Sequence, residues 1–271
     1  MAIISLARQV AAHGDEVAAI LADKLNYTFI KRTDIEKRIV ELGFPESKLP
    51  KFDERKPGFF DSMTKIRDQY FNYSQYAMLE AAVKNNVILI GRGAFYLMRD
   101  ISSNVSVRLV ADEKTRVKRL CDEFNWTEKQ ALQRIQESDS NRDGFHKSFY
   151  TVDVADPSNF NFVVNTGLCS EAASADIIAD FVKKNVASAQ EAEGLIQLQN
   201  KLKIQKIVNK LLFENKLDIE FFHGEIKEKT VYIYGIAKSV VVVEQALEVF
   251  KKEMPDYEAV SAVTVTTDFR Y

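Results

Sequence analysis

The sequence predicts an α/β protein with a doubly wound parallel sheet, followed by a second, smaller α+β domain. Over residues 1–185, short β-branched apolar runs alternate with segments of helical periodicity, as they do when crossover helices join parallel strands. After a polar stretch over 186–200, the order changes to helix, strand, strand, helix, strand. We therefore predict a first domain over 1–185, a linker or exposed helix over 186–200, and an α-β-β-α-β domain over 201–271, which lies within the usual size range of domains.

Two predicted strands of the first domain end at small residues. Ile3–Leu6 continues into a loop that reaches Gly14, and Val87–Ile90 continues into Gly91-Arg92-Gly93. A helix over 16–25 follows the first loop. Ligands of open α/β sheets bind at the carboxyl edge of the strands, where helix N-termini offer free N–H groups. This opening has the layout of a phosphate-binding loop, although the usual Lys-Ser/Thr is missing.

The other elements are expected from periodicity and capping residues. Asp112 and Thr127 should cap the helices that follow them, and the proline-broken stretch 47–60 should be a loop. Val240–Val243 has strand propensity, but the apolar spacing that continues to Phe250 favours a helix. The expected helices are 33–42, 62–84, 94–99, a cation-rich helix after Asp112, 127–138, 170–184, 204–215 and 239–254. The remaining expected strands are 105–110, 160–165, 217–222, 230–236 and 259–267.

Composition limits the classes of function. The net charge of −2 provides no basic field for nucleic acid. Cys121 and Cys169 are the only cysteines and lack metal-ligand spacing, so we expect no protein metal site. The start of the chain lacks a basic region followed by a long apolar core, and no apolar run reaches 18 residues. We expect a cytoplasmic protein without membrane association.

The first domain carries cations where phosphate chemistry would need them. Phosphoryl transfer depends on phosphate oxygens held by backbone N–H groups, cations and Mg²⁺. Arg8 lies in the first loop, Arg92 lies between two glycines at a strand end, and Arg134 and Arg142 flank Asp139. We therefore predict a nucleotide pocket between the Arg8 edge and the Arg92 edge.

These stretches resemble the cytidylate-kinase-like family of P-loop nucleoside monophosphate kinases. The matching stretches are Ile4–Gln9, Gly14, Phe52–Arg55, Ile90–Ala94, Asp139–Arg142, Asp156–Phe160 and Val164–Thr166. The resemblance implies a P-loop kinase-like fold over 1–185. It also implies ATP-dependent phosphorylation of a nucleoside monophosphate, CMP or dCMP, with Mg²⁺ accompanying ATP.

The resemblance also implies roles for particular residues. The ATP phosphates would lie against Arg8, Ala12, His13, Gly14, Asp15 and Glu16. The monophosphate would lie against Arg32, Gly91, Arg92 and Gly93, the lid would include Arg134, Asp139 and Arg142, and the catalytic groups would be Arg92, Asp139 and Arg142.

The first loop departs from the family pattern. Gly-Ser-Gly-Gly of the family corresponds to Ala11–Gly14 here, and Asp15 stands where a cation is commoner. The lost glycines restrict the positive-φ conformations that a phosphate cradle uses. An alternative function is therefore a non-catalytic protein that senses a nucleotide or another anion, or binds a partner, on a kinase scaffold.

Structural roles compete with each of these functional ones. Asp15 could cap the first helix, and His13 could be a turn residue. Asp139 and Arg142 could form an exposed pair on a helix. The cations of Lys114–Arg119 are expected on a solvated helix face.

The second domain resembles a BON domain in its order of elements and in Gly235–Ser239 before the second helix. That resemblance implies binding of phospholipid or a partner. The chain has no secretory features and its charges are mixed, so we favour a regulatory or oligomerising role through a protein partner or a second copy. We expect no nucleic-acid binding, because Gly224–Lys227 lacks the second glycine of a GxxG loop.

Overall fold

The computed structural model describes residues 2–52, 65–84 and 86–266, and the chain divides into two compact units. Unit 1 covers Met1–Ile196 and unit 2 covers Gln197–Tyr271. The boundary falls inside the helix α9 (Ser188–Asn209). The polar stretch over 186–200 is therefore largely helical.

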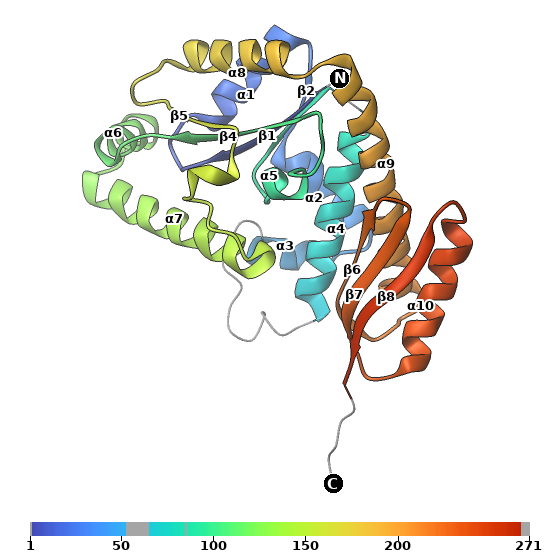
Figure 1. The fold of residues 1–271 in the computed structure, drawn as a ribbon. Helices are drawn as coiled ribbons and strands as arrows, with labels where there is room; N and C mark the ends of the chain where they lie inside the picture. Colours follow the sequence, from blue (N-terminus) through green and yellow to red (C-terminus); the bar gives the residue numbers. More distant parts are fainter. Residues whose placement is uncertain (1, 53–64, 85, 267–271) are drawn as a thin grey trace. The chain divides into compact units, whose positions relative to one another are not determined.

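Unit 1 contains the parallel sheet that the sequence predicts (Figure 1). Its strands are β1 (Ile3–Arg8), β2 (Thr28–Ile30), β3 (Val87–Ile90), β4 (Asn104–Val110) and β5 (Phe162–Asn165). They pair in the order β2-β3-β1-β4-β5, and every pairing is parallel. The strands β1 and β4 are neighbours in the middle, so their carboxyl ends lie together at one edge of the sheet. The three-residue strand β2 was not predicted.

The helices of unit 1 follow the expected order with shifted ends. They are α1 (Gly14–Leu25), α2 (Arg32–Glu41), α3 (Leu49–Phe52), α4 (Lys65–Ala82), α5 (Ala94–Leu97), α6 (Glu113–Phe124), α7 (Glu128–Tyr150) and α8 (Glu171–Asn185), with 3₁₀ turns at Glu46–Lys48 and Pro157–Asn159. The helix expected to end at Ser138 continues to Tyr150. The stretch expected as a loop is helical over 46–52, and its remainder lies outside the described residues, as do Asp53-Glu54-Arg55.

One core cluster of unit 1 lies between the sheet and two helices, and the buried rings of Phe44, Phe52 and Tyr70 pack together in another. Val17 and Leu21 of α1 and Ile178 and Val182 of α8 pack against apolar side chains of β1, β3, β4 and β5. Figure 1 shows α1 and α8 on one side of the sheet and α4 and α5 on the other. Both faces of the sheet are therefore covered, as a doubly wound fold requires.

Two predicted helix caps are present, and one is absent. The Asp112 side chain accepts from Thr115 N–H, and the Thr127 side chain accepts from Gln130 N–H. Helix α1 instead begins at Gly14, and its N-cap is His13 without a side-chain cap bond. Asp15 lies within the first turn, so the interpretation of Asp15 as a cap was wrong.

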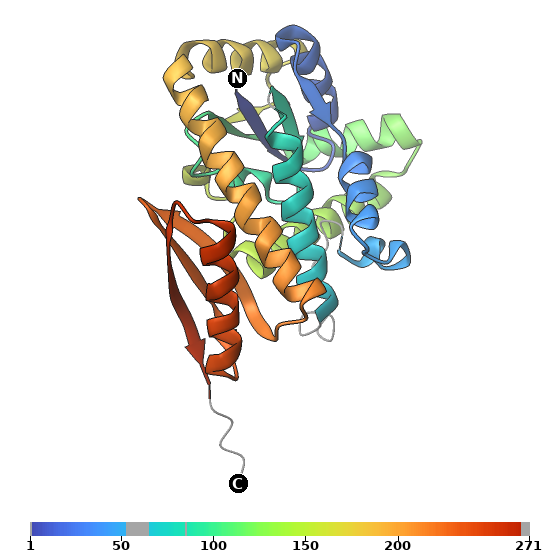
Figure 2. The same cartoon turned by 90° about the vertical axis from the view of Figure 1, so that its right-hand side faces the viewer.

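Unit 2 has the predicted α-β-β-α-β order (Figure 2). After α9 come a π-helical turn (Lys210–Glu214), β6 (Ile219–Lys227), β7 (Thr230–Ala237), α10 (Val240–Glu253) and β8 (Glu258–Val265). The sheet order is β6-β7-β8, with β6 antiparallel and β8 parallel to β7. Its core joins Ile204 and Leu211 to Ile233 and Phe250. The valine run that begins at Val240 is helical, as expected.

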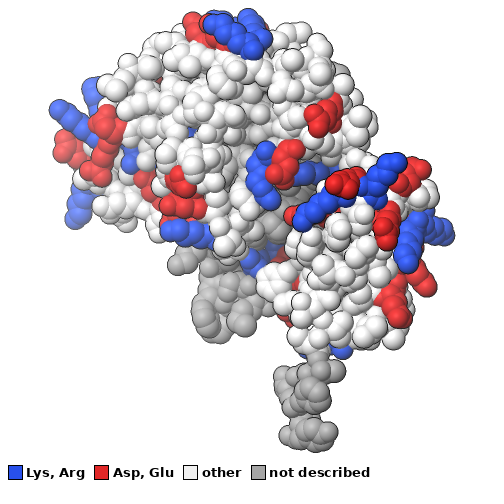
Figure 3. All heavy atoms as spheres, viewed as in Figure 1, with Lys and Arg blue, Asp and Glu red and all other residues white. Residues whose placement is uncertain are grey.

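The surface carries charges of both signs. On the face drawn in Figure 3, basic and acidic side chains are interspersed, and the coloured residues form no broad region of one sign. Within the described ranges, no helix is both long and apolar enough to cross a membrane.

Candidate functional site

The loop between β1 and α1 contains two non-glycine residues in the left-handed conformation. Ala11 and His13 have φ angles of 57° and 50°, and they occupy two of the positions at which the family pattern has glycine. L-residues pay roughly 1–2 kcal/mol for a left-handed conformation. The loss of these glycines was expected to restrict the left-handed conformation in the loop. This expectation was wrong, because Ala11 and His13 adopt that conformation. Contacts from the rest of unit 1 must stabilise it.

Those contacts come from α6 and from the segment after β5. Arg119 Nη1 donates to Ala11 O at 2.9 Å, and Arg119 Nη2 donates to Thr166 O at 2.7 Å. Thr166 Oγ1 is 3.1 Å from Ala12 O, to which it donates. Thr166 is 2% exposed. One guanidinium and one hydroxyl thus bind two successive carbonyls of the loop.

His13 connects the loop to α8. His13 Nδ1 hydrogen-bonds Glu171 Oε1, and Arg119 Nη2 lies 3.9 Å from the same carboxylate oxygen. The His13 hydrogen bond is the main reason that the pKa of Glu171 is lowered from its ordinary value. His13 therefore binds a carboxylate within unit 1, at the loop position where a phosphate ligand was expected.

Gly14 is needed for close packing at the start of α1. A Cβ added there would lie 2.7 Å from Arg8 Cγ and 3.3 Å from Ile90 Cδ1. The first N–H groups of a helix have no partner within the helix. The first turn of α1 therefore presents backbone donors beside the ends of β1 and β3, in an arrangement that suits an anion.

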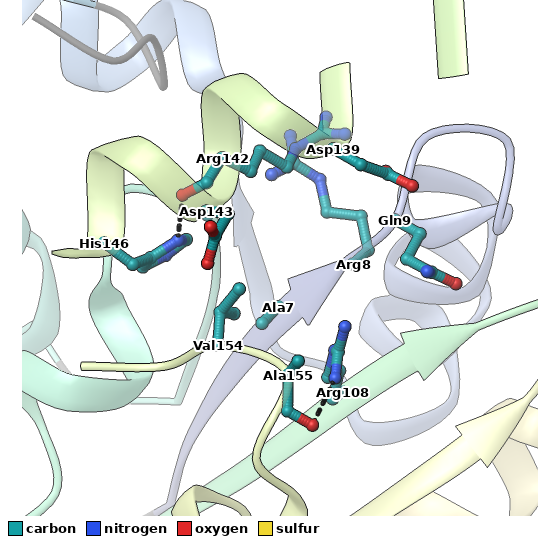
Figure 4. A pocket seen from close by; sticks show the side chains of 11 residues that line it. Ala7, Arg8, Gln9, Arg108, Asp139, Arg142, Asp143, His146, Val154 and Ala155 are labelled. Atoms are coloured by element: carbon teal, nitrogen blue, oxygen red, sulfur yellow. Dashed lines mark hydrogen bonds between the residues drawn. The ribbon is translucent and has the colours of Figure 1, made fainter. Parts of the chain in front are cut away.

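A cavity of about 240 Å³ lies at the carboxyl edge of the sheet (Figure 4). It is lined by Ala7, Arg8, Gln9, Gly91, Arg108, Asp139, Arg142, Asp143, His146, Val154 and Ala155. Figure 4 shows the Arg8 side chain extending from the end of β1 toward α7, which carries Arg142. Three arginines from β1, β4 and α7 thus border one small space, and this suits a phosphoryl group better than an apolar ligand.

One face of α7 forms a wall of this cavity. Asp139, Arg142, Asp143 and His146 follow the i, i+3, i+4, i+7 spacing of a single helical face. Arg142 Nη1 donates to Ser138 Oγ at 2.6 Å, and His146 Nδ1 lies 2.7 Å from Arg142 O. The continuation of the helix beyond Ser138 is what places these side chains together.

Asp139 pairs with Arg116, a cation that the sequence analysis expected on a solvated helix face. Arg116 Nη1 donates to both carboxylate oxygens of Asp139, at 3.1 and 2.9 Å, and Arg116 is 6% exposed. The expectation of a solvated face for Lys114–Arg119 was therefore wrong for Arg116 and Arg119. It was right for Lys118, whose exposed side chain pairs with Asp122 one helical turn away.

Arg108 was missed by the sequence analysis. It follows Ser106 in the alternation of β4, on the face opposite Val107. Its Nη1 donates to Ala155 O at 2.9 Å, and burial is the main cause that lowers the pKa of its guanidinium. A cation within an apolar alternating strand near its carboxyl end was the signal available in the sequence.

The Arg92 segment has an unusual backbone. Gly91, Arg92 and Gly93 have φ angles of 77°, 52° and 74°. A Cβ on Gly93 would lie 2.1 Å from the Tyr150 ring, and Tyr150 O–H donates to Arg92 O at 2.8 Å. Burial raises the pKa of the Tyr150 hydroxyl, which therefore stays a donor. The end of β3 is thus fixed against the end of α7.

The Arg92 side chain points into an ion-pair cluster. It is 3% exposed, and its Nη2 lies 3.3 Å from Glu36 Oε1, the oxygen that Arg32 Nε also binds at 2.9 Å. The structure thus brings together Arg32 and Arg92, the two cations predicted for the monophosphate. Within the segment Gly91-Arg92-Gly93, Gly91 lines the cavity. Arg134 is exposed on α7 and does not line it.

Asp15 and Glu16 add negative charge near the loop. Both are exposed in the first turn of α1. In the described part of the chain, no group of three or more His, Cys, Asp or Glu side chains could hold a metal ion.

Comparison with known proteins identifies the family. The model of the cytidylate kinase-like family matches residues 3–168, and the chain belongs to this family. The match includes the first loop, the Arg92 segment and α7. It ends before unit 2 begins. No curated protein matches the chain.

Solved structures are similar to unit 1 at low sequence identity. A crystal structure of an uncharacterized protein from Eubacterium ventriosum has a TM-score of 0.56 and 17% identity, covering 68% of this chain and 98% of that one. At this identity the likeness shows the fold alone. Shikimate kinase from Bacteroides thetaiotaomicron (TM-score 0.41, 17% identity, 67% of this chain and 98% of that one covered) and deoxyadenosine kinase from M. mycoides with bound dATP (TM-score 0.38, 16% identity, 67% and 99% covered) are also similar.

Proposed function

We propose that unit 1 is an ATP-dependent nucleoside monophosphate kinase acting on CMP or dCMP. The observation that carries the proposal is the cavity at the carboxyl edge of the sheet, bordered by Arg8, Arg108 and Arg142. A transferring phosphoryl group carries charge on its equatorial oxygens, and preorganised cations stabilise that charge. Membership of the cytidylate kinase-like family supports the same reaction class.

The proposed roles include residues that line the cavity and residues of neighbouring segments that do not. The loop through Gly14 and the first turn of α1 would bind the ATP phosphates through backbone N–H groups, with Arg8 beside them. Arg32 and Arg92 would bind the monophosphate once it displaces them from Glu36. Arg142 would contact the group in transfer, while Arg116 positions Asp139 on the wall of α7.

Mg²⁺ would arrive with the nucleotide. The cavity contains two carboxylates, and each already has a cation: Asp139 pairs with Arg116, and Asp143 pairs with Lys147. Mg²⁺ in kinase sites is bound mainly by phosphate oxygens and water, with few protein carboxylates. The residues present fit a metal held by the nucleotide, and its contribution when bound is to neutralise phosphate charge.

A second candidate is a non-catalytic sensor of a nucleotide or another anion. The His13–Glu171 contact favours it, because a carboxylate already binds the loop where a phosphate would approach. Exposed Asp15 and Glu16 add repulsion at the same helix end. In this candidate the cavity would bind one anion, and ATP would not be turned over.

Calorimetric titration with ATP·Mg²⁺ and with CMP distinguishes the two candidates. A kinase should bind both nucleotides and form ADP and CDP when they are mixed. A sensor should bind CMP or inorganic phosphate and show no heat with ATP. Absence of binding by all three ligands would contradict both candidates.

Arg142 provides a sharper test of the kinase proposal. Replacing it with Ala should lower kcat about 10²–10³-fold, the usual loss when one group that stabilises transition-state charge is removed. Lys129→Ala is the control, because Lys129 is a cation on the same helix that is exposed, lies outside the cavity and has no assigned role. Equal turnover of the two variants would contradict the role of Arg142.

For unit 2 we propose a BON-like regulatory or oligomerising role. The α-β-β-α-β order supports it, and a protein partner or second copy suits its mixed surface charges better than a membrane. If unit 2 binds phospholipid instead, the intact chain should sediment with anionic vesicles.

A further inference from the structure

The strand β8 is an edge strand of the unit 2 sheet. Among the described residues it pairs with β7 alone. Glu258 N–H donates to Lys229 O at one end of β8, and Thr266 N–H donates to Ala237 O at the other. Backbone groups of a strand alternate in direction, so the even-numbered residues face β7. The N–H and C=O groups of Ala259, Ser261, Val263 and Val265 therefore face away from the sheet.

The composition of β8 does not protect this edge. Residues 259–265 contain no charge, no proline and no glycine. Natural proteins usually block such edges with charges, proline or a bulge. The opposite edge strand, β6, is protected in this way, because it carries Glu220, Glu225 and Lys227 and its register shifts between Glu220 and His223.

Burial along β8 is also incomplete. None of its eight residues is fully buried, whereas β6 buries Ile219 and Phe222 and β7 buries Val231 and Ile233. The side chains that share the core face with Val231 and Ile233 of β7 are Ala259, Ser261 and Val263, and all three are partly exposed. Another strand beside β8 would extend the core over them.

From these observations we propose that β8 pairs antiparallel with β8 of a second copy of this chain, joining two three-stranded sheets into one. The register follows from the direction of the backbone groups. In each hydrogen-bonded pair, the N–H and C=O groups of both residues must point toward the other strand, and the two side chains must lie on the same face of the joined sheet. The two residue numbers must therefore add to an even sum.

A pairing centred on Ala262 satisfies these conditions best. It places Ala259 opposite Val265 and Ser261 opposite Val263, so every outward N–H and C=O of β8 finds a partner. It also leaves Glu258 outside the uncharged ladder. Val263 N–H now donates to Ser261 Oγ at 3.1 Å, and the pairing would replace this local bond. Centring on Ser261 would instead place Val265 opposite Tyr257, whose N–H is already bonded to Met254 O.

Cysteine cross-linking tests this register in the full chain. In a background with Cys121→Ala and Cys169→Ala, Ala262→Cys should form a disulfide-linked dimer. Ala262 would face its own copy in a non-hydrogen-bonded pair with Cα atoms about 4.5 Å apart, within disulfide reach. Thr264→Cys is the matched control on the same exposed face. Thr264 would face Val260 of the second copy, so two introduced cysteines would lie roughly four strand residues apart, beyond disulfide reach.

The oligomeric state tests the proposal independently. Sedimentation of the cysteine-containing native chain should give a dimer across the micromolar range, and Ala262→Lys should give a monomer because it places two like charges opposite each other. Circular dichroism should be the same for both, since Ala262 is exposed. A monomeric native chain would overturn the proposal. So would a dimer that survives Ala262→Lys, or equal cross-linking at positions 262 and 264.

Discussion

Ala11 and Ala12 are adjacent alanines in different backbone environments. Ala11 has a φ of 57°, whereas Ala12 is fully buried and is not among the positive-φ residues described. Glycine relieves the left-handed strain at Ala11 but gives no such relief at Ala12, and the entropic cost of glycine is the same at both. Ala11→Gly should therefore be more stable than Ala12→Gly by about 1–2 kcal/mol, measured by urea unfolding. Equal stabilities would mean that the loop carries no strain at Ala11.

Glu171 should make the stability of unit 1 depend on pH. Its folded-state pKa lies below the ordinary value of 4.5, chiefly because of the His13 hydrogen bond. The ionised group therefore stabilises the fold above pH 4.5, and this contribution disappears as the pH falls through the lower folded-state pKa. Glu171→Gln should destabilise the protein near neutral pH, and its cost should shrink on acidification.

The control for that measurement is Glu128→Gln. Glu128 is the first residue of α7, as Glu171 is of α8, but it is exposed. The two variants thus share the interaction with a helix N-terminus and differ in the His13 contact. A cost at Glu171 that does not vary with pH, or that matches the cost at Glu128, would contradict this account.

At the scale of elements, α6 supports the loop between β1 and α1. Arg119→Ala would leave the carbonyls of Ala11 and Thr166 without their guanidinium donor, at a cost of about 1–3 kcal/mol per buried unsatisfied group. Lys118→Ala, one residue earlier, removes an exposed ion pair with Asp122 and should change the unfolding free energy by less than about 0.5 kcal/mol. Urea unfolding of both variants checks this difference, and similar losses would show that Arg119 does not brace the loop.

Helix α7 illustrates what the sequence could and could not predict. Its start was predictable from the Thr127 cap, but its end was not, because Asp139–Gly144 contains residues of weak helix propensity. Phe145, Phe149 and Tyr150 are buried against the rest of unit 1, and this tertiary packing outweighs the local preference. The cavity wall formed by Asp139 and His146 depends on that continuation.

The same limit applies to the charged residues of the site. Arg8 could be predicted as a cavity residue because it lies at the end of a strand. Arg142 could be predicted because it belongs to the stretch Asp139–Arg142, which resembles the family. Arg116 and Arg119 lie on a helix whose other cations are exposed, and only their tertiary partners distinguish them from Lys118.

At the scale of the whole molecule, the change in periodicity after residue 185 predicted an α/β fold followed by an α+β fold, because each of the two patterns requires its own core.

The separate cores of the two units lead to a last prediction. Phe44 in unit 1 and Phe250 in unit 2 are both at most 2% exposed, and replacing either with Ala should cost about 3–5 kcal/mol within its own core. If the units unfold independently, hydrogen exchange should accelerate over 2–196 for Phe44→Ala and over 197–266 for Phe250→Ala. The end of α9 should follow unit 2, because Ile204 and Val208 belong to that core. Faster exchange throughout both units in either variant would mean that α9 couples them into one cooperative structure.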